Sequence, residues 1–218
     1  MRKIRLTTVA AALVATLALT AVVFFAGCGK EGGDVTVPEV PNAPAVNAQG
    51  PTTDIDAVIH RLAAASPAEA EAIWNGLPAE IQKAVSESQQ VTKVETCEEI
   101  TGGDRGSRTV TRCAYGYNAL HQTVWAYCER VDWTYDRIRV TSHTTSRWGQ
   151  VYSSFWTFEG HVDFRETGGD GWPWYYAYTK GHFHRHLWPG GPVIQEVYPW
   201  VWIRVTGAGT SSSDAGAA

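Results

Sequence analysis

The stretch that decides the fold is WPWYYAYTKGHFHRHLW, residues 172–188. Side chains alternate between the two faces of a β-strand, so residues two apart share a face. In an unbroken strand, one face carries Trp172, Trp174, Tyr176, Tyr178, Lys180, His182, His184, His186 and Trp188. The other face carries Tyr175, Ala177, Thr179, Gly181, Phe183, Arg185 and Leu187. A turn at Lys180-Gly181 is the alternative, and it would fold the strip in two.

Aromatic residues are concentrated around this stretch. Nine of the ten Trp, all nine Tyr and four of the six Phe lie between residues 91 and 206. β-Branched and aromatic residues favour strands, and the Gly- and Pro-rich stretches between them favour turns. We predict strands near residues 107–116, 121–134, 137–147, 150–165, 172–188 and 193–206. About six strands with short turns predict a mainly β domain, an antiparallel β-sandwich or barrel, over residues 91–206.

Residues 53–90 have the pattern of two or three short helices. Apolar side chains recur at i, i+3, i+4 and i+7 from Ile55. Ser66-Pro67-Ala68-Glu69 is a helix start, with a capping Ser, Pro at the first helical position and Glu at the third. Such helices are too few to bury a core alone, so we expect them to dock on the β domain or on a partner. The Gly-, Ser- and Ala-rich residues 207–218 are predicted to be a disordered tail.

The N-terminus has the layout of an export signal, with basic residues followed by an uncharged apolar run from Leu6 to Ala26. Phe25-Ala26-Gly27-Cys28 resembles the processing box of bacterial lipoproteins. The resemblance implies that residues 1–27 are a cleaved export signal and that Cys28 carries a lipid that anchors the protein to a membrane. An uncleaved signal anchor is the alternative, because the apolar run is long enough to span a bilayer.

Residues 28–52 contain many Pro and Gly and few large apolar side chains, so we expect an extended tether. Two stretches of the β region, His121-Gln122-Thr123-Val124-Trp125 and Tyr198-Pro199-Trp200-Val201-Trp202-Ile203-Arg204-Val205, resemble small exported bacterial proteins that have no assigned function. This second resemblance implies an exported all-β domain and brings no catalytic residues with it.

Three cysteines follow Cys28, and an oxidising compartment favours a disulfide between two of them. Cys113 and Cys128 lie on two predicted strands, which suits a cross-strand link. Cys97 with Cys113 is the alternative pair.

The composition bears on the function class. Residues 105–218 carry 11 basic and 9 acidic side chains, which is not basic enough to indicate a nucleic-acid partner. The sequence has no Gly-x-Ser-x-Gly elbow, no His-Glu-x-x-His and no phosphate-binding Gly loop. We therefore favour a non-enzymatic protein.

A flat strip of rings bordered by cations could stack sugars or bind an acidic polymer. The candidate ligand-binding residues are Trp172, Trp174, Tyr176, Tyr178 and Trp188. Packing of the same rings as core is the alternative. Our first hypothesis is an exported, membrane-tethered surface protein that binds envelope polysaccharide or an envelope protein. A structural envelope protein without a ligand is a further hypothesis.

The histidine row suggests different chemistry. His182 and His184 would lie on one face about 7 Å apart, so both could bind one metal ion. A third ligand would have to come from a neighbouring strand, with His161, Glu159 or Asp163 as candidates. This predicts a zinc or copper site in a metal-binding, hydrolase-like protein. A half-exposed histidine row without metal is the alternative.

Overall fold

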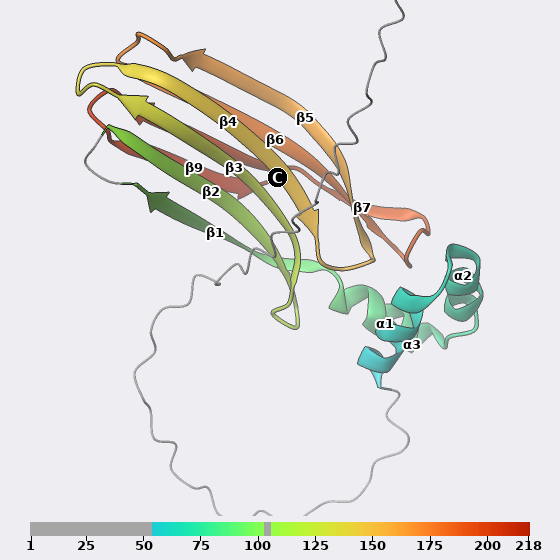
Figure 1. Cartoon of the computed structure of the whole chain (residues 1–218). Coiled ribbons are helices and arrows are strands. Elements are labelled where there is room, and N and C mark those ends of the chain that lie inside the picture. Colours follow the sequence, from blue (N-terminus) through green and yellow to red (C-terminus); the bar gives the residue numbers. More distant parts are fainter. Residues whose placement is uncertain (1–53, 103–105) are drawn as a thin grey trace, which may run out of the picture. The chain divides into compact units, whose positions relative to one another are not determined.

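The computed structural model describes residues 54–102 and 106–218. The predicted export signal, Cys28 and the tether lie outside the described residues. Within these residues three short helices precede nine strands (Figure 1). The helices are α1 (Ile55–Ala64), α2 (Pro67–Asn75) and α3 (Ala79–Ser88). The strands are β1 (Val91–Thr101), β2 (Ser107–Asn118), β3 (Thr123–Tyr135), β4 (Val140–Val151), β5 (Trp156–Gly168), β6 (Trp174–His186), β7 (Val193–Val197), β8 (Pro199–Thr206) and β9 (Ser211–Ala217).

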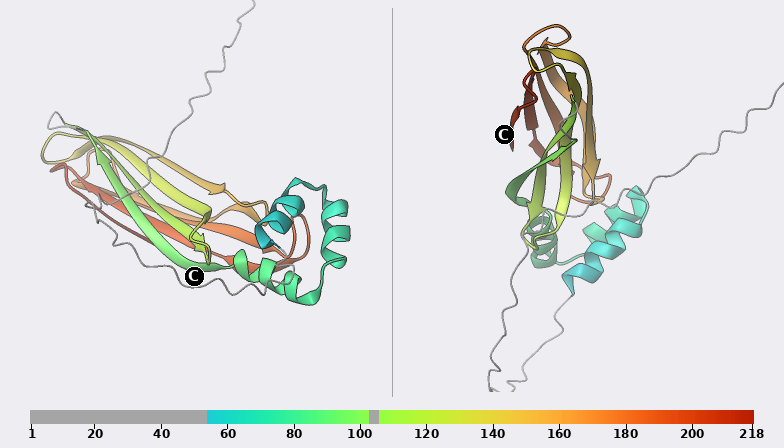
Figure 2. Two further views of the ribbon diagram at one scale, coloured as in Figure 1. Left: turned by 90° about the horizontal axis from the view of Figure 1, so that it is seen from below. Right: turned by 60° about the vertical axis from the view of Figure 1, so that its left-hand side comes forward.

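The strands form two antiparallel sheets that pack face to face (Figure 2). The first sheet has the order β1-β2-β3-β4. The second has the order β5-β6-β8-β9, with β7 also paired to β6. The prediction of a mainly β, antiparallel fold preceded by short helices is confirmed, and the sheets form a sandwich and not a closed barrel.

The core between the sheets is built largely from aromatic rings. The largest fully buried apolar side chains in the described residues include Trp125, Trp133, Trp156, Tyr127, Tyr175, Phe155 and Phe183. Burying one large apolar side chain contributes about 1.5–3 kcal/mol. Gly181 of β6 makes room for one of these rings, because a Cβ there would lie 2.6 Å from the Tyr127 ring of the opposite sheet. The buried face of β6 is therefore fixed by contact with the first sheet.

The C-terminal residues form a strand and not the predicted disordered tail. Ser211–Ala217 is β9, which pairs with β8 in a continuous antiparallel register. Its small residues fit beneath a large neighbour, because a Cβ at Gly216 would lie 2.9 Å from the Trp200 ring. Composition misled the prediction, since Ser, Gly and Ala also form a strand where an existing sheet edge supplies the hydrogen bonds.

β1 is an edge strand that was not among the strands predicted from the sequence, of which the first began near residue 107. Most of its side chains are exposed, so it lacks the buried alternation by which strands are recognised. Lys93, Glu95, Glu98 and Glu99 give it a row of charged side chains. Such charges are typical of the edge strands of soluble sheets.

The helical segment docks on one end of the sandwich, as the sequence suggested. The Trp74 ring of α2 packs on Trp188, with ring centroids 5.8 Å apart. The indole N–H of Trp156 donates to the backbone oxygen of Gln89 at 3.2 Å. The Arg185 guanidinium donates to the backbone oxygen of Ser86 at 2.6 Å. No helix in residues 54–102 or 106–218 has the length and apolar character needed to cross a membrane.

The predicted helix start at Ser66 is confirmed. The Glu69 carboxylate accepts hydrogen bonds from the backbone N–H and the hydroxyl of Ser66, at 2.9 and 2.7 Å. These bonds lower the pKa of Glu69, with the bond from the Ser66 side chain as the larger cause. α2 therefore begins where a capping residue and Pro67 together favour it.

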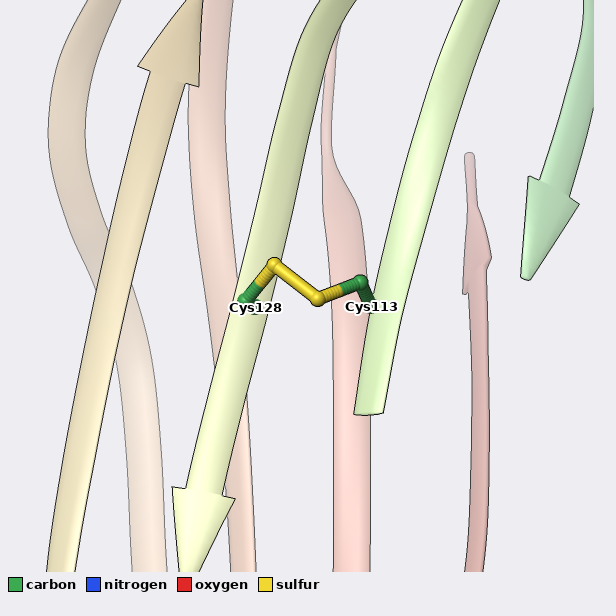
Figure 3. Close-up of a disulfide and its surroundings, with 2 residues drawn as sticks. All are labelled: Cys113 and Cys128. Carbon is green, nitrogen blue, oxygen red and sulfur yellow. A yellow bond between two sulfur atoms is a disulfide. The ribbon is translucent and has the colours of Figure 1, made fainter. Parts of the chain in front are cut away.

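A disulfide links the middle of the first sheet. Cys113 of β2 and Cys128 of β3 are direct cross-strand neighbours and are bonded to each other (Figure 3). The predicted pairing is confirmed, and no cysteine in the described part of the chain is a free thiol. A disulfide is compatible with an oxidising, extracytoplasmic compartment.

Candidate functional site

The outer face of β6 is half exposed along its whole length. β6 runs unbroken from Trp174 to His186, so the alternative turn at Lys180-Gly181 does not form. Burial alternates at every residue, with odd-numbered side chains buried against the first sheet and even-numbered side chains half exposed. The predicted division of this strand into two faces is confirmed.

The rings of β6 continue sideways onto β8. Tyr178 is the register partner of Trp202, and Lys180 is the partner of Trp200. The Tyr176 and Trp202 rings are stacked, with centroids 6.2 Å apart and planes inclined by 26°. We call the outer surface formed by these neighbouring rings the ring face. Its members are Trp174, Tyr176, Tyr178, Trp200 and Trp202.

A shallow groove of about 530 Å³ lies on the ring face. The Arg204 guanidinium lies over the Trp174 ring, 5.3 Å from its centroid. This contact holds the cation at the groove while its N–H groups can donate to a ligand. The lining residues are Thr167, Trp174, Tyr176, Trp202, Arg204 and Ser212.

The sequence-predicted ring residues divide between two places. Trp174 and Tyr176 line the groove, and Tyr178 lies beside them on the ring face. Trp172 precedes β6, is 53% exposed and meets Trp174 edge to face at 6.0 Å. Trp188 lies outside the ring face, because it packs on Trp74 of the helical segment.

Trp202 and Arg204 were not singled out from the sequence. The sequence feature that could have identified them is the alternation in residues 199–206, where Trp200, Trp202 and Arg204 occupy even-numbered positions and therefore share one face. That alternation becomes informative only when β8 is known to pair with β6. The pairing itself depends on the loops between the two strands, which the side-chain pattern does not encode.

At the other end of β6 the outer face carries a cluster of imidazoles and carboxylates. The potential ligand atoms of His182, His184 and Glu196 all lie within 4.8 Å of one another. His182 Nε2 lies 3.3 Å from Glu196 Oε2, and His184 Nε2 lies 3.7 Å from Glu196 Oε1. We call these three residues the His-His-Glu cluster. Glu196 belongs to β7, where it is the register partner of His184.

Hydrogen bonds orient the carboxylate of this cluster. The Tyr198 hydroxyl donates to Glu196 Oε2 at 2.6 Å. This bond lowers the pKa of Glu196 and raises the pKa of Tyr198. The Tyr198 ring also stacks on His182, with centroids 4.5 Å apart and planes inclined by 7°. Two contacts from one tyrosine therefore fix both His182 and Glu196.

His161, proposed from the sequence as a third metal ligand, does not reach the cluster. β5 contains a bulge between Phe158 and Gly160, at which Gly160 has a φ of +121°. The extra residue shifts the alternation, so His161 pairs with the inward-facing Gly181. Its Nδ1 lies 2.8 Å from the Tyr127 hydroxyl of the opposite sheet.

Glu159 and Asp163, the other two candidates, remain on the outer side of β5 but play different parts. Glu159 Oε1 lies 3.4 Å from His184 Nδ1, the ring nitrogen that points away from Glu196. Asp163 is the register partner of Lys180 and forms an ion pair with Arg165. Glu159 is therefore next to the His-His-Glu cluster, and Asp163 is not.

A separate titratable group lies between the sheets. Glu129 of β3 is fully buried, and neither of its carboxylate oxygens has a hydrogen-bond partner in the protein. Its register neighbours Arg112 and Arg147 form ion pairs with Asp214 and Glu166 of the second sheet. Burial raises the pKa of Glu129 to about 8, and the nearby charge of Arg147 only partly opposes it.

No protein-family model, no curated protein and no solved structure matches this chain. The features of the molecule that point to a function are therefore the groove, the ring face and the His-His-Glu cluster.

Proposed function

We propose that this protein is an exported, membrane-tethered envelope protein whose sandwich binds a polysaccharide chain along the ring face. The observation that carries the proposal is the groove, in which stacked rings lie beside a guanidinium group. Export and tethering are supported by the N-terminal sequence pattern and by the disulfide in the first sheet. The anchor is the predicted lipid on Cys28, and the membrane is its partner.

The geometry of the rings suits a sugar. Tyr176 and Trp202 are nearly parallel rings on neighbouring strands, and the apolar face of a pyranose can stack on such a ring. Arg204 offers fork-shaped donors for hydroxyl or carboxylate oxygens. A groove of about 530 Å³ lies within the range of small-ligand sites, ~300–1,000 Å³.

The ring face is also not needed to stabilise the sandwich core. The buried face of β6 already supplies Tyr175 and Phe183 to the core between the sheets. The outer rings are left half exposed, at the cost of apolar surface in contact with water. A binding role explains this exposure better than packing does.

The test is affinity electrophoresis of the detergent-extracted protein in gels that contain soluble envelope polysaccharide. We expect wild type to be retarded, and Trp202→Ala and Trp174→Ala to lose more than about tenfold in affinity, as at a binding hot spot. The matched control is Tyr152→Ala, which removes an exposed ring outside the groove. Unretarded wild type would favour a purely structural envelope role and end the binding proposal.

A further inference from the structure

The donor atoms of the His-His-Glu cluster are spaced as ligands of one metal ion. Zinc binds imidazole nitrogen and carboxylate oxygen at ~2.0–2.2 Å, so neighbouring tetrahedral ligands lie about 3.4 Å apart. The separation from Glu196 is 3.3 Å for His182 Nε2 and 3.7 Å for His184 Nε2. All three potential ligand atoms lie within 4.8 Å of one another, a spacing at which one ion can contact all of them.

One nitrogen atom of the cluster is buried without a hydrogen-bond partner in the protein. This atom is Nε2 of His184. A buried ring nitrogen without a partner is costly, and coordination of a cation removes that cost. The same nitrogen is the one that faces Glu196.

The neighbours of His184 are those that orient a metal-bound histidine. A metal-bound histidine usually directs its other ring N–H at a carboxylate, which fixes the tautomer. His184 Nδ1 lies 3.4 Å from Glu159 Oε1, and Glu159 also accepts a hydrogen bond from the Thr157 hydroxyl at 2.8 Å. With the proton on Nδ1, the lone pair is on Nε2, where the ion would bind.

The remaining histidine of the row is engaged elsewhere. His186 Nδ1 lies 2.7 Å from the backbone oxygen of Gly191, and His186 Nε2 lies 3.1 Å from the Thr157 hydroxyl. It therefore supports Thr157 and is not a third imidazole ligand. Two imidazoles and one carboxylate are a donor set for zinc, copper and other divalent transition metals.

We propose that His182, His184 and Glu196 bind one divalent transition-metal ion, for which zinc is the reference ion, with Glu159 and Tyr198 orienting the ligands. Three protein ligands leave one position of a tetrahedral ion open to water or to a ligand oxygen. The site is distinct from the groove, because Tyr176, the groove residue of β6 nearest to the cluster, is six positions from His182, about 20 Å at ~3.3 Å per residue.

The test is calorimetric titration of the full chain, purified through a tag without histidines and stripped with a chelator, with Zn²⁺ as the only added ligand. We expect one equivalent to bind to wild type. His182→Ala and His184→Ala should lose more than about 100-fold in affinity, since loss of a residue that only hydrogen-bonds to a ligand already costs about 10–100-fold. Glu196→Gln keeps the side-chain shape but removes the charge, and it should also bind zinc more weakly than wild type does.

His60→Ala is the matched control, because His60 is an exposed histidine of α1 that is remote in sequence from β6. It should bind zinc as wild type does. Zinc should also raise the Tm of wild type and of His60→Ala, and leave the Tm of folded site variants unchanged. Wild type that does not saturate, or site variants that bind like His60→Ala, would overturn the proposal.

The outcome is independent of polysaccharide binding. Trp202→Ala should retain zinc affinity while it loses retardation in the gel. If wild type binds zinc but not polysaccharide, the metal site stands and the proposed function fails. If wild type binds polysaccharide but not zinc, the proposed function stands and the metal site fails.

Discussion

Replacing the buried Glu129 by Gln should stabilise the protein at neutral pH. Glu129 has a pKa of about 8 in the folded protein, against an ordinary value of 4.5 that applies to the unfolded chain. Between these pH values the unfolded chain has released its proton and the folded protein has not. The unfolded state binds fewer protons, so the free energy of unfolding falls as the pH rises through this window.

The magnitude follows from the difference between the two pKa values. Each pH unit inside the window lowers the free energy of unfolding by about 1.4 kcal/mol, so the carboxyl costs about 3 kcal/mol at pH 7. Gln cannot ionise, and it is as neutral as the protonated acid that it replaces. Arg112 and Arg147 keep their ion pairs with Asp214 and Glu166, so the substitution leaves neither guanidinium without a carboxylate.

The assay is thermal unfolding followed by circular dichroism between pH 5 and pH 8. In a chain of this size 1 kcal/mol shifts Tm by about 2–4 °C, so Glu129→Gln should raise Tm by about 6–12 °C at pH 7. At pH 5 the two proteins should nearly coincide. Glu99→Gln, on the exposed edge strand β1, is the matched control and should follow wild type. A difference between Glu129→Gln and wild type that does not widen with rising pH would refute the reasoning.

Two further predictions concern the cysteines. Replacing Cys113 and Cys128 together by Ala should lower the free energy of unfolding by about 3 kcal/mol, the value for a closed loop of about 15 residues; an unchanged midpoint in urea would count against this. The intact mass of the membrane-extracted protein should correspond to a chain that begins at Cys28 and carries acyl groups. A mass that begins at Met1, or a non-reduced peptide map that links Cys28 to another cysteine, would contradict lipid attachment, because an acylated thiol cannot form a disulfide.

The parts of the fold that could be predicted are determined mainly by residues close to one another in the sequence. The two faces of β6 follow from alternation within one strand, and the start of α2 follows from Ser66, Pro67 and Glu69. Both patterns are local, so tertiary structure had little opportunity to override them. The Cys113–Cys128 disulfide was favoured because the two cysteines lie on two predicted strands, and the bond that the two form in the structure decides for it over the Cys97–Cys113 alternative.

The parts that could not be predicted depend on contacts between strands. β9 has no apolar pattern, and its structure comes from pairing with β8. The third donor of the His-His-Glu cluster comes from the β6–β7 register, which places Glu196 opposite His184. His161 was misplaced because the inserted residue between Phe158 and Gly160 reverses the face that His161 occupies, and a second bulge between His161 and Asp163 restores the original alternation. A bulge of this kind leaves only a weak trace in sequence, here Gly160.

The charged edge strand β1 affects whether copies of this protein aggregate when they are close together. Copies anchored to one membrane, as proposed for this protein, would share a thin layer, where their local concentration is far higher than in bulk solution. An uncharged edge there would invite strands of adjacent copies to join into a continuous sheet. Lys93, Glu95, Glu98 and Glu99 oppose this association, since extending the sheet would place their charges beside those of the next copy. Neutralising these charges would therefore promote aggregation through this edge.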